Sequence, residues 1–289
     1  MKALVTGAGG QLGGALLRTV PAAWQATGLT HRELDISDAA AVARVVGELA
    51  PQLIINAAAY TAVDRAESEP DVALRINATG AENLARAARE AGARFIHVST
   101  DFVFDGLASR PYLPDAPTRP LSAYGRSKLE GEQRVRNILG DEALIVRTAW
   151  VYAANGQNFV RTMLRLMGER DRVRVVADQI GSPTWATSLA RALWAAAERG
   201  EVRGIQHWTD AGVASWYDFA VAIREEALAM GLLSRAAPVE PIATEDYPTP
   251  ARRPAYSVLD RRAFEQAIDM RPEHWRANLR RALEEMKGA

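Results

Sequence analysis

The chain has 289 residues, of which 48% are hydrophobic and 24% charged, a composition typical of a globular protein with a substantial core. Lys and Arg together number 35, as do Asp and Glu, so no net charge favours binding to nucleic acid or to an anionic membrane. The absence of cysteine excludes disulfides, thiolate zinc sites and thiol catalysis.

The N-terminal stretch MKALVTGAGG lacks the apolar core of a signal peptide. No apolar run elsewhere approaches the ~18 residues that a membrane-spanning helix needs. We therefore expect a cytoplasmic protein without a membrane partner.

Short apolar runs alternate with helical patterns through the first half of the chain. Strands are expected at 2–6, 24–30, 53–59, 93–100 and 143–148. Helices are expected between them, including 71–92 and 123–138, and Ser37 or Asp38 is a candidate N-cap. This alternation predicts an α/β fold with a Rossmann-type, doubly wound parallel sheet covered by helices on both faces.

The pattern becomes looser in the second half. Helices are expected at 157–168, 184–199, 214–230 and 274–286, short strands at 173–177 and 204–208, and a proline-rich loop at 238–254. We expect a first domain over residues 1–152 and a smaller C-terminal α/β domain over 153–289. Some elements from 173–208 are expected to return to the first sheet.

A glycine-rich segment, GAGGQLG, follows the first expected strand and opens the first expected helix. Gly7, Gly10 and Gly13 are spaced three apart. Glycines at such a turn let the backbone approach a pyrophosphate, which binds to the amide groups of the helix N-terminus. A merely tight turn is the alternative, but the strand before it and the helix after it favour a dinucleotide site.

The second strand ends in GLTHREL, where dinucleotide-binding proteins read the adenosine ribose. Thr30, His31 and Arg32 precede the first carboxylate, Glu33, and an arginine here accommodates a 2′-phosphate. NADP(H) is therefore favoured over NAD(H). In the alternative, Arg32 is solvated and Glu33 or Asp35 binds the ribose.

The stretch SAYGRSK places Tyr124 four residues before Lys128, so both side chains lie on one face of the expected helix. Taken alone, this also fits an ordinary solvated helix start. Together with the glycine loop, NAAA (56–59) and STDFVFDG (99–106), however, it resembles the extended short-chain dehydrogenase/reductase superfamily. The resemblance implies that Tyr124 is the general acid, Lys128 its partner and Thr100 the hydroxyl that holds the substrate oxygen. Asn77 matches the helix asparagine of that superfamily.

These roles agree with elementary chemistry. A free phenol has a pKa of about 10, which is high for proton exchange near neutrality. We expect the ammonium of Lys128 and the positive nicotinamide ring to lower the pKa of Tyr124. The phenol then donates a proton while Thr100 hydrogen-bonds the developing alkoxide.

Longer segments resemble one family in particular, the dTDP-4-dehydrorhamnose reductases. They are NAAAYTAVDRAESEP (56–70), STDFVFDG, YGRSKLEGE, RTAWVYAANGQNFVRTML (147–164) and YPTPARRP (247–254). The resemblance implies reduction of the C4 ketone of dTDP-4-dehydro-β-L-rhamnose by NAD(P)H, the last step in making dTDP-L-rhamnose for cell-surface polysaccharide. The related sugar-nucleotide dehydratases carry a glutamate at position 102, where this chain has Phe102, so dehydration is not expected.

The same resemblance implies that Asp101 and Trp150 contact the sugar. Arg252 and Arg253 are candidates for the diphosphate, or else they are simply exposed. Asn158 and Phe159 are candidates for recognising and stacking the thymine, although Phe159 is equally suited to a core. The cofactor-binding candidates are Gly7, Gly10, Gln11, Leu12, Gly13, Thr30, His31, Arg32, Asp35, Ile36, Ala58, Ala59, Tyr60, Thr61, Tyr124 and Lys128.

No metal site is expected. Some members of the family hold magnesium between two subunits through a glutamate where this chain has Ala15, so a magnesium-linked dimer is doubtful and a monomer or homodimer is expected. The four histidines share no zinc-binding spacing. The alternatives for function are another sugar-nucleotide ketoreductase or epimerase, or a non-catalytic NADP-binding regulatory subunit. The presence of Thr100, Tyr124 and Lys128 together favours catalysis.

Overall fold

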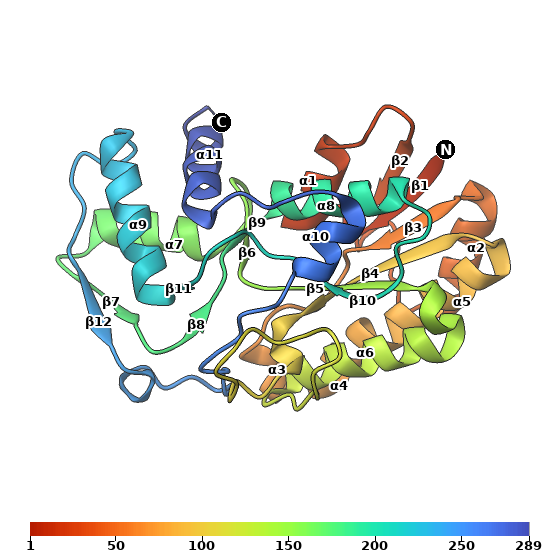
Figure 1. The fold of residues 1–289 in the computed structure, drawn as a ribbon, viewed down its shortest axis with the longest axis horizontal. Coiled ribbons are helices and arrows are strands. Elements are labelled where there is room, and N and C mark those ends of the chain that lie inside the picture. Colours follow the sequence, from red (N-terminus) through yellow and green to blue (C-terminus); the bar gives the residue numbers. More distant parts are fainter. Residues whose placement is uncertain (289) are drawn as a thin grey trace.

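The computed structural model describes residues 1–288 and contains a central six-stranded parallel sheet (Figure 1). Its strands are β1 (Lys2–Thr6), β2 (Gln25–Leu29), β3 (Leu53–Asn56), β4 (Arg94–Thr100), β5 (Leu144–Thr148) and β10 (Gly204–His207). Their order is β10-β5-β4-β3-β1-β2, and every pairing is parallel. Each of the five strands expected in the first half is present.

Helices cover both faces of this sheet, which is why its central strands are apolar along their length. Every residue of β3 and β5 is buried. One face carries α1 (Gln11–Arg18), α8 (Ala186–Glu198) and α10 (Arg262–Ile268) (Figure 1). The other carries α2 (Ala39–Leu49), α5 (Gly80–Ala91) and α6 (Ala123–Leu139). The expected Rossmann-type fold is confirmed.

The segment between β3 and β4 is more broken than the single expected helix. It comprises α3 (Arg65–Ser68), α4 (Pro70–Leu74) and a π-helical turn (Arg75–Thr79) that leads into α5. At the start of α2, Asp38 is the N-cap, because its carboxylate accepts from the amides of Ala40 and Ala41.

A second group of elements lies at one side of the sheet, to the left in Figure 1. It contains α7 (Phe159–Glu169), α9 (Trp216–Ala229) and α11 (Trp275–Lys287), with β7 (Val173–Val176) paired in parallel to β12 (Val239–Ile242). Two short strand pairs accompany them, β6 (Val151–Tyr152) with β9 (Thr184–Trp185) and β8 (Ile180–Gly181) with β11 (Ala214–Ser215). Aromatic and aliphatic side chains from these elements form a separate core.

The second half of the chain differs from expectation in several places, including the short strands β6, β8, β9 and β11, which were not expected. The segment 238–254 was expected to be a loop throughout, which is wrong for its first residues because β12 pairs with β7. Helix α10 was not expected. Of the elements in 173–208, β10 joins the central sheet and α8 packs on α1, whereas β7 belongs to the smaller group.

The order of the strands places a ligand crevice at one edge of the sheet. The chain passes from β2 across β1 to β3, so the connections from β1 and β3 leave in opposite directions at their carboxyl ends. Open α/β sheets bind ligands at such a switch point. None of the helices in residues 1–288 combines the length and apolar character that a membrane crossing requires.

Helix α6 is fixed to the sheet by a buried ion pair. Glu132 of α6 accepts from Nε and Nη2 of Arg147 on β5 at 2.9 and 2.7 Å, and both side chains are 2% exposed. Nη1 of Arg147 donates to the carbonyl oxygen of Pro114 at 3.0 Å, and the guanidinium lies over the ring of Phe104. The arginine is thus hydrogen-bonded in three directions, as a buried charge requires.

We expect Glu132→Gln to destabilise the fold strongly, because it leaves the buried guanidinium of Arg147 without a counter-charge. The expected loss in free energy of unfolding is about 3–5 kcal/mol, measured by urea denaturation. The matched control is Glu130→Gln on the same helix, where Glu130 pairs with the half-buried Arg134 at 2.9 Å. That change should cost less than about 1 kcal/mol. Equal losses in the two variants would contradict this account of α6.

Candidate active site

The glycine loop forms a close-packed turn between β1 and α1. Gly7 has φ +72°, a left-handed conformation that favours glycine, and a Cβ there would lie 2.7 Å from Cα of Ala58. A Cβ at Gly13 would lie 2.1 Å from the carbonyl oxygen of Gly7. The N-terminus of α1 has no side-chain cap and no acidic residue in its first turn. Its amides are therefore suited to an anion such as a pyrophosphate.

The turn after β2 carries its cationic residues outward. Glu33 accepts from the amide and the hydroxyl of Thr30 at 2.8 Å each, and these hydrogen bonds hold the pKa of Glu33 below its usual value. The carboxylate therefore closes its own turn, whereas His31 and Arg32 are exposed. Asp35 is likewise engaged locally, accepting from the amide and hydroxyl of Ser37. This arrangement favours Arg32 as the group that meets a 2′-phosphate.

Two of the apolar cofactor-binding candidates, Leu12 and Ile36, have buried side chains. Leu12 lies in the core beneath α1, and Ile36 lies in the core on the opposite face of the sheet. A Cβ at Gly80 would lie 2.6 Å from the side chain of Ile36, and the carbonyl oxygen of Ile36 accepts from Asn83 at 3.0 Å. Only the main-chain amides of Leu12 and Ile36 are therefore available to a cofactor.

Asn77 joins the turn after β3 to helix α6. Its Oδ1 accepts from the amide of Tyr60 at 2.8 Å, and its Nδ2 donates to the carbonyl oxygen of Tyr60 and to Oγ of Ser127. The phenol of Tyr60 donates to Glu69 at 2.8 Å, while Thr61 is exposed. A single buried amide thus sets the position of the Ala58–Thr61 turn relative to the helix that carries Tyr124 and Lys128.

Thr100, Asp101 and Tyr124 lie together where β4 ends and α6 begins. Oγ1 of Thr100 donates to Asp101 at 3.0 Å and accepts from the amide of Phe102 at 3.2 Å, and the phenol of Tyr124 lies near Thr100. The ring of Phe102 packs edge-on against that of Tyr124, with centroids 5.6 Å apart. A Cβ at Gly125 would lie 2.3 Å from the carbonyl oxygen of Phe102. Glycine at position 125 therefore allows the start of α6 to approach the end of β4.

Desolvation dominates the electrostatics of this group. Burial raises the pKa of Tyr124 to about 12, partly opposed by the nearby hydroxyl of Thr100. Burial likewise raises the pKa of Asp101 to about 6. The expected lowering of the Tyr124 pKa by Lys128 is not found, because burial outweighs other effects and the ammonium is directed elsewhere.

The ammonium of Lys128 donates to the carbonyl oxygen of Val98 at 2.7 Å. Burial lowers the pKa of Lys128 to about 8, while the negative charge of Glu132 opposes the shift. His97 lies on the same strand as Val98, and burial together with the charge of Lys128 holds its pKa well below the usual value. The ammonium of Lys128 is therefore fixed to the backbone near the carboxyl end of β4.

Trp150 follows β5 and is held in an unusual conformation. It has φ +48°, which a non-glycine residue rarely adopts. Its indole stacks on Trp216, with centroids 3.5 Å apart and an interplanar angle of 7°. A Cβ at Gly181 would lie 2.6 Å from the Trp150 ring. The indole is thus fixed between Trp216 and the backbone of Gly181. The sequence did not single out Trp216.

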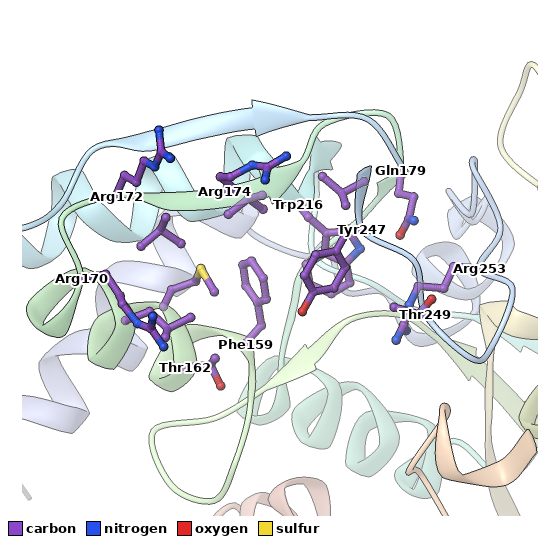
Figure 2. Close-up of a pocket in the computed structure, with 15 residues that line it drawn as sticks. Phe159, Thr162, Arg170, Arg172, Arg174, Gln179, Trp216, Tyr247, Thr249 and Arg253 are labelled. Atoms are coloured by element: carbon purple, nitrogen blue, oxygen red, sulfur yellow. The ribbon is translucent and has the colours of Figure 1, made fainter. Parts of the chain in front are cut away.

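A cavity of about 580 Å³ adjoins this tryptophan pair (Figure 2). Aromatic side chains from three segments line it, Phe159 from α7, Trp216 from α9 and Tyr247 from the loop after β12. Four arginines also line it, Arg170, Arg172, Arg174 and Arg253, with Arg170 and Arg253 at opposite ends of the view in Figure 2. A cationic cavity with aromatic walls is suited to a nucleoside diphosphate.

Several lining residues were missed by sequence reasoning. Arg170, Arg172 and Arg174 are spaced two apart, and in extended backbone this spacing places side chains on one face. That alternation was a readable signal for a cationic surface. Trp216, Tyr247 and Thr249 carry no comparable signal, because only the tertiary fold brings their segments together.

Comparison with known proteins identifies one family over nearly the whole chain. The model of one family, described as the RmlD substrate binding domain, matches residues 1–287. A spore coat polysaccharide biosynthesis protein of Bacillus subtilis is 43% identical over 100% of this chain and 99% of its own length. The dTDP-4-dehydrorhamnose reductase of Burkholderia thailandensis is 44% identical over 96% of each chain.

The chain belongs to the RmlD family. A crystal structure of the Bacillus anthracis dTDP-4-dehydrorhamnose reductase in complex with NADP aligns with a TM-score of 0.91 and 36% identity, covering 98% of this chain and 99% of that one. The family resemblance inferred from the sequence motifs is therefore confirmed.

In this RmlD-family chain, Asn158 lies between the glycine loop and the smaller group of elements. Its Oδ1 accepts from the amide of Arg161, which caps α7, and its Nδ2 donates to Oε1 of Gln11 at 2.9 Å and to the carbonyl oxygen of Ala153 at 2.8 Å. The polar atoms of Asn158 are thus engaged by the chain itself. Phe159, next to it, presents its ring to the cavity.

The two candidate arginines differ in position. Arg252 is exposed, whereas Arg253 lines the cavity and pairs with Asp64 at 2.7 Å. Among residues 1–288 of this RmlD-family chain, no cluster of three or more His, Asp or Glu side chains is arranged to hold a metal ion.

We expect Lys128→Met to stabilise the RmlD-family fold at neutral pH, by about 1–3 kcal/mol. The pKa of Lys128 is about 8 in the folded chain, against 10.5 for an ordinary lysine, so between these values the folded chain binds fewer protons than the unfolded chain. The free energy of unfolding of the native chain should therefore rise as pH increases from about 8 to 10.5.

In the Lys128→Met variant this rise should be missing, as measured by urea denaturation across that pH range. The control is Lys287→Met, which removes an exposed lysine near the end of α11 and should leave the rise unchanged. A native-like pH dependence in Lys128→Met would show that Lys128 is not the titrating group.

Proposed function

We propose that this chain reduces the C4 ketone of dTDP-4-dehydro-β-L-rhamnose to dTDP-L-rhamnose, with NADPH as the reductant. The observation that carries the proposal is the grouping of Thr100 and Tyr124 at the carboxyl end of β4, with Lys128 one helical turn further along α6. The polysaccharide and rhamnose names of its relatives support a product used in cell-surface polysaccharide.

NADPH, when bound, supplies the hydride. The uncapped N-terminus of α1 beside Gly7, Gly10 and Gly13 would hold its pyrophosphate, and Arg32 its 2′-phosphate. Lys128 lies where its ammonium would reach the nicotinamide ribose. The glycine loop and Arg32 are uncapped or exposed groups that the fold leaves available, whereas Lys128 is buried.

Tyr124 acts as the proton donor in this direction of reaction. The phenol is protonated at neutral pH, which is the state in which it can donate to a carbonyl oxygen that gains negative charge. The hydroxyl of Thr100 donates to Asp101 in the structure, and by rotating it can donate to the same oxygen instead. Because both groups are buried, water does not compete for that oxygen.

The cationic cavity would bind the nucleotide part of the substrate. Thr100 pairs in register with Thr148 on β5, and Trp150 follows two residues later and stacks on Trp216 in the cavity wall. This series of contacts joins the catalytic threonine to the cavity. Asp101 and Trp150 would contact the sugar, the rings of Phe159 and Tyr247 the thymine, and Arg253, with Arg252 beside it, the diphosphate.

We expect Tyr124→Phe to lower the turnover number by about 10²–10⁴-fold, because it removes the general acid. Oxidation of NADPH by the purified protein with dTDP-4-dehydrorhamnose measures the rate, and fluorescence titration with NADPH should give an unchanged dissociation constant. The control is Tyr217→Phe on α9, which should keep native turnover.

The same assay on the native protein distinguishes between the candidate functions. Consumption of NADPH in step with the ketone establishes reduction, whereas an epimerase would regenerate its cofactor and show no net consumption. A protein that binds NADPH but turns over no keto-sugar would be a binding subunit. Native turnover in Tyr124→Phe would show that another group donates the proton.

We expect Arg32→Ala to lower kcat/KM for NADPH by about tenfold while leaving that for NADH nearly unchanged, because an exposed guanidinium pairs with the 2′-phosphate. Arg44→Ala, which removes an exposed arginine from α2, is the control. The assignment of Arg32 fails if the ratio of the two kcat/KM values stays at its native level.

A further inference from the structure

The segment NAAAYTAVDRAESEP (56–70) forms the cofactor-side turn and also carries three carboxylates that contact other parts of the chain. Beyond Tyr60 it places Asp64, Glu67 and Glu69 on or beside the short helix α3. Glu67 accepts from the amide of Ala123 at 2.7 Å, at the start of α6. Glu69 accepts from the phenol of Tyr60. Only Asp64 reaches the smaller group of elements.

Asp64 uses both carboxylate oxygens on the loop that follows β12. Its Oδ1 accepts from the amide of Ala251 at 3.2 Å, and its Oδ2 accepts from Nη2 of Arg253 at 2.7 Å. The two contacts, to main chain and side chain two residues apart, fix both the path of the loop and the direction of the guanidinium. Asp64 and Arg253 are separated by 189 positions in sequence.

The other end of this loop is fixed within the smaller group. Asp178 accepts from the amide of Thr244 at 3.0 Å and from its hydroxyl at 2.7 Å. Between the two anchors lies Tyr247, which is 60% exposed and lines the cavity. The loop is therefore held at Thr244 and at Ala251–Arg253, with its aromatic tip between them.

The ion pair leaves much of the arginine available to a ligand. Only Nη2 of Arg253 is bound by Asp64, so Nε and Nη1 remain as donors, and the side chain is 26% exposed and lines the cavity. A guanidinium fixed on one edge binds an anion with less loss of side-chain entropy than a mobile one. The carboxylate of Asp64 thus orients the guanidinium of Arg253 while leaving some of its N–H donors for a ligand.

We propose that Asp64 is a positioning residue for the substrate: from the cofactor side of the molecule it holds Arg253 at the cavity, ready for the diphosphate of the sugar nucleotide. This inference rests on the proposed function. It also connects the two expected ligand sites, since the segment that forms the cofactor-side turn also carries the carboxylate that fixes the substrate loop.

The test is a comparison of Asp64→Asn, Arg253→Gln and the double variant with the native enzyme. We expect Asp64→Asn to raise KM for dTDP-4-dehydrorhamnose and the dissociation constant of dTDP about tenfold, with kcat within about twofold of native, because ordering of the arginine is lost. The dissociation constant of NADPH should not change. The double variant should be no weaker than Arg253→Gln alone, since Asp64 acts through that arginine.

Asp71→Asn, an exposed carboxylate on the neighbouring helix α4, is the matched control and should keep native constants. Thermal denaturation checks that Asp64→Asn retains the fold, as a half-exposed pair predicts. Additive losses in the double variant, an unchanged KM, or tighter binding of dTDP would each overturn the inference. An inactive native enzyme would instead count against the proposed function, and dTDP binding would still test the role of Asp64.

Discussion

The buried pair between Arg147 and Glu132 is the constraint on which the active site depends. It fixes α6 to β5 in a place where neither charge has access to water, and α6 carries both Tyr124 and Lys128. A helix tied only by apolar contacts tolerates small sliding movements, whereas a two-pronged hydrogen-bonded pair has one geometry. The pair therefore sets the position of the phenol relative to Thr100 on the neighbouring strand.

Exclusion of water from this region also shifts the pKa values of the two residues on α6. Burial raises the pKa of Tyr124 and lowers that of Lys128, so the charged ammonium of Lys128 is held at a cost in folding free energy. Catalytic sites commonly carry such local destabilisation, and the remainder of the fold offsets it. Here the compensating elements are close at hand, in the fully buried strands β3 and β5 and in the amide of Asn77, which ties α6 to the cofactor-side turn.

Local patterns in the sequence predicted the sheet, the glycine loop and the helix that presents Tyr124, because strand periodicity, turn glycines and i, i+4 spacing are all short-range properties. They did not predict β12, which exists only because β7 lies beside it, or the cavity wall formed by Trp216 and Tyr247. The contribution of burial to the pKa of Tyr124 was also missed, since it depends on how the chain packs around the phenol. The role of Asp64 could not be predicted from local patterns either, because its partners Ala251 and Arg253 lie far along the chain.

Trp150 and Gly181 have a consequence for how relatives of this protein can diverge. The indole occupies the volume that a side chain at position 181 would need, and the left-handed backbone at Trp150 is one that glycine or asparagine adopts more readily than tryptophan. A substitution at Gly181 is therefore acceptable only after the residue at position 150 has become smaller, whereas the reverse order leaves a gap that can be filled later. The two positions should change together across evolutionary time, with position 150 changing first.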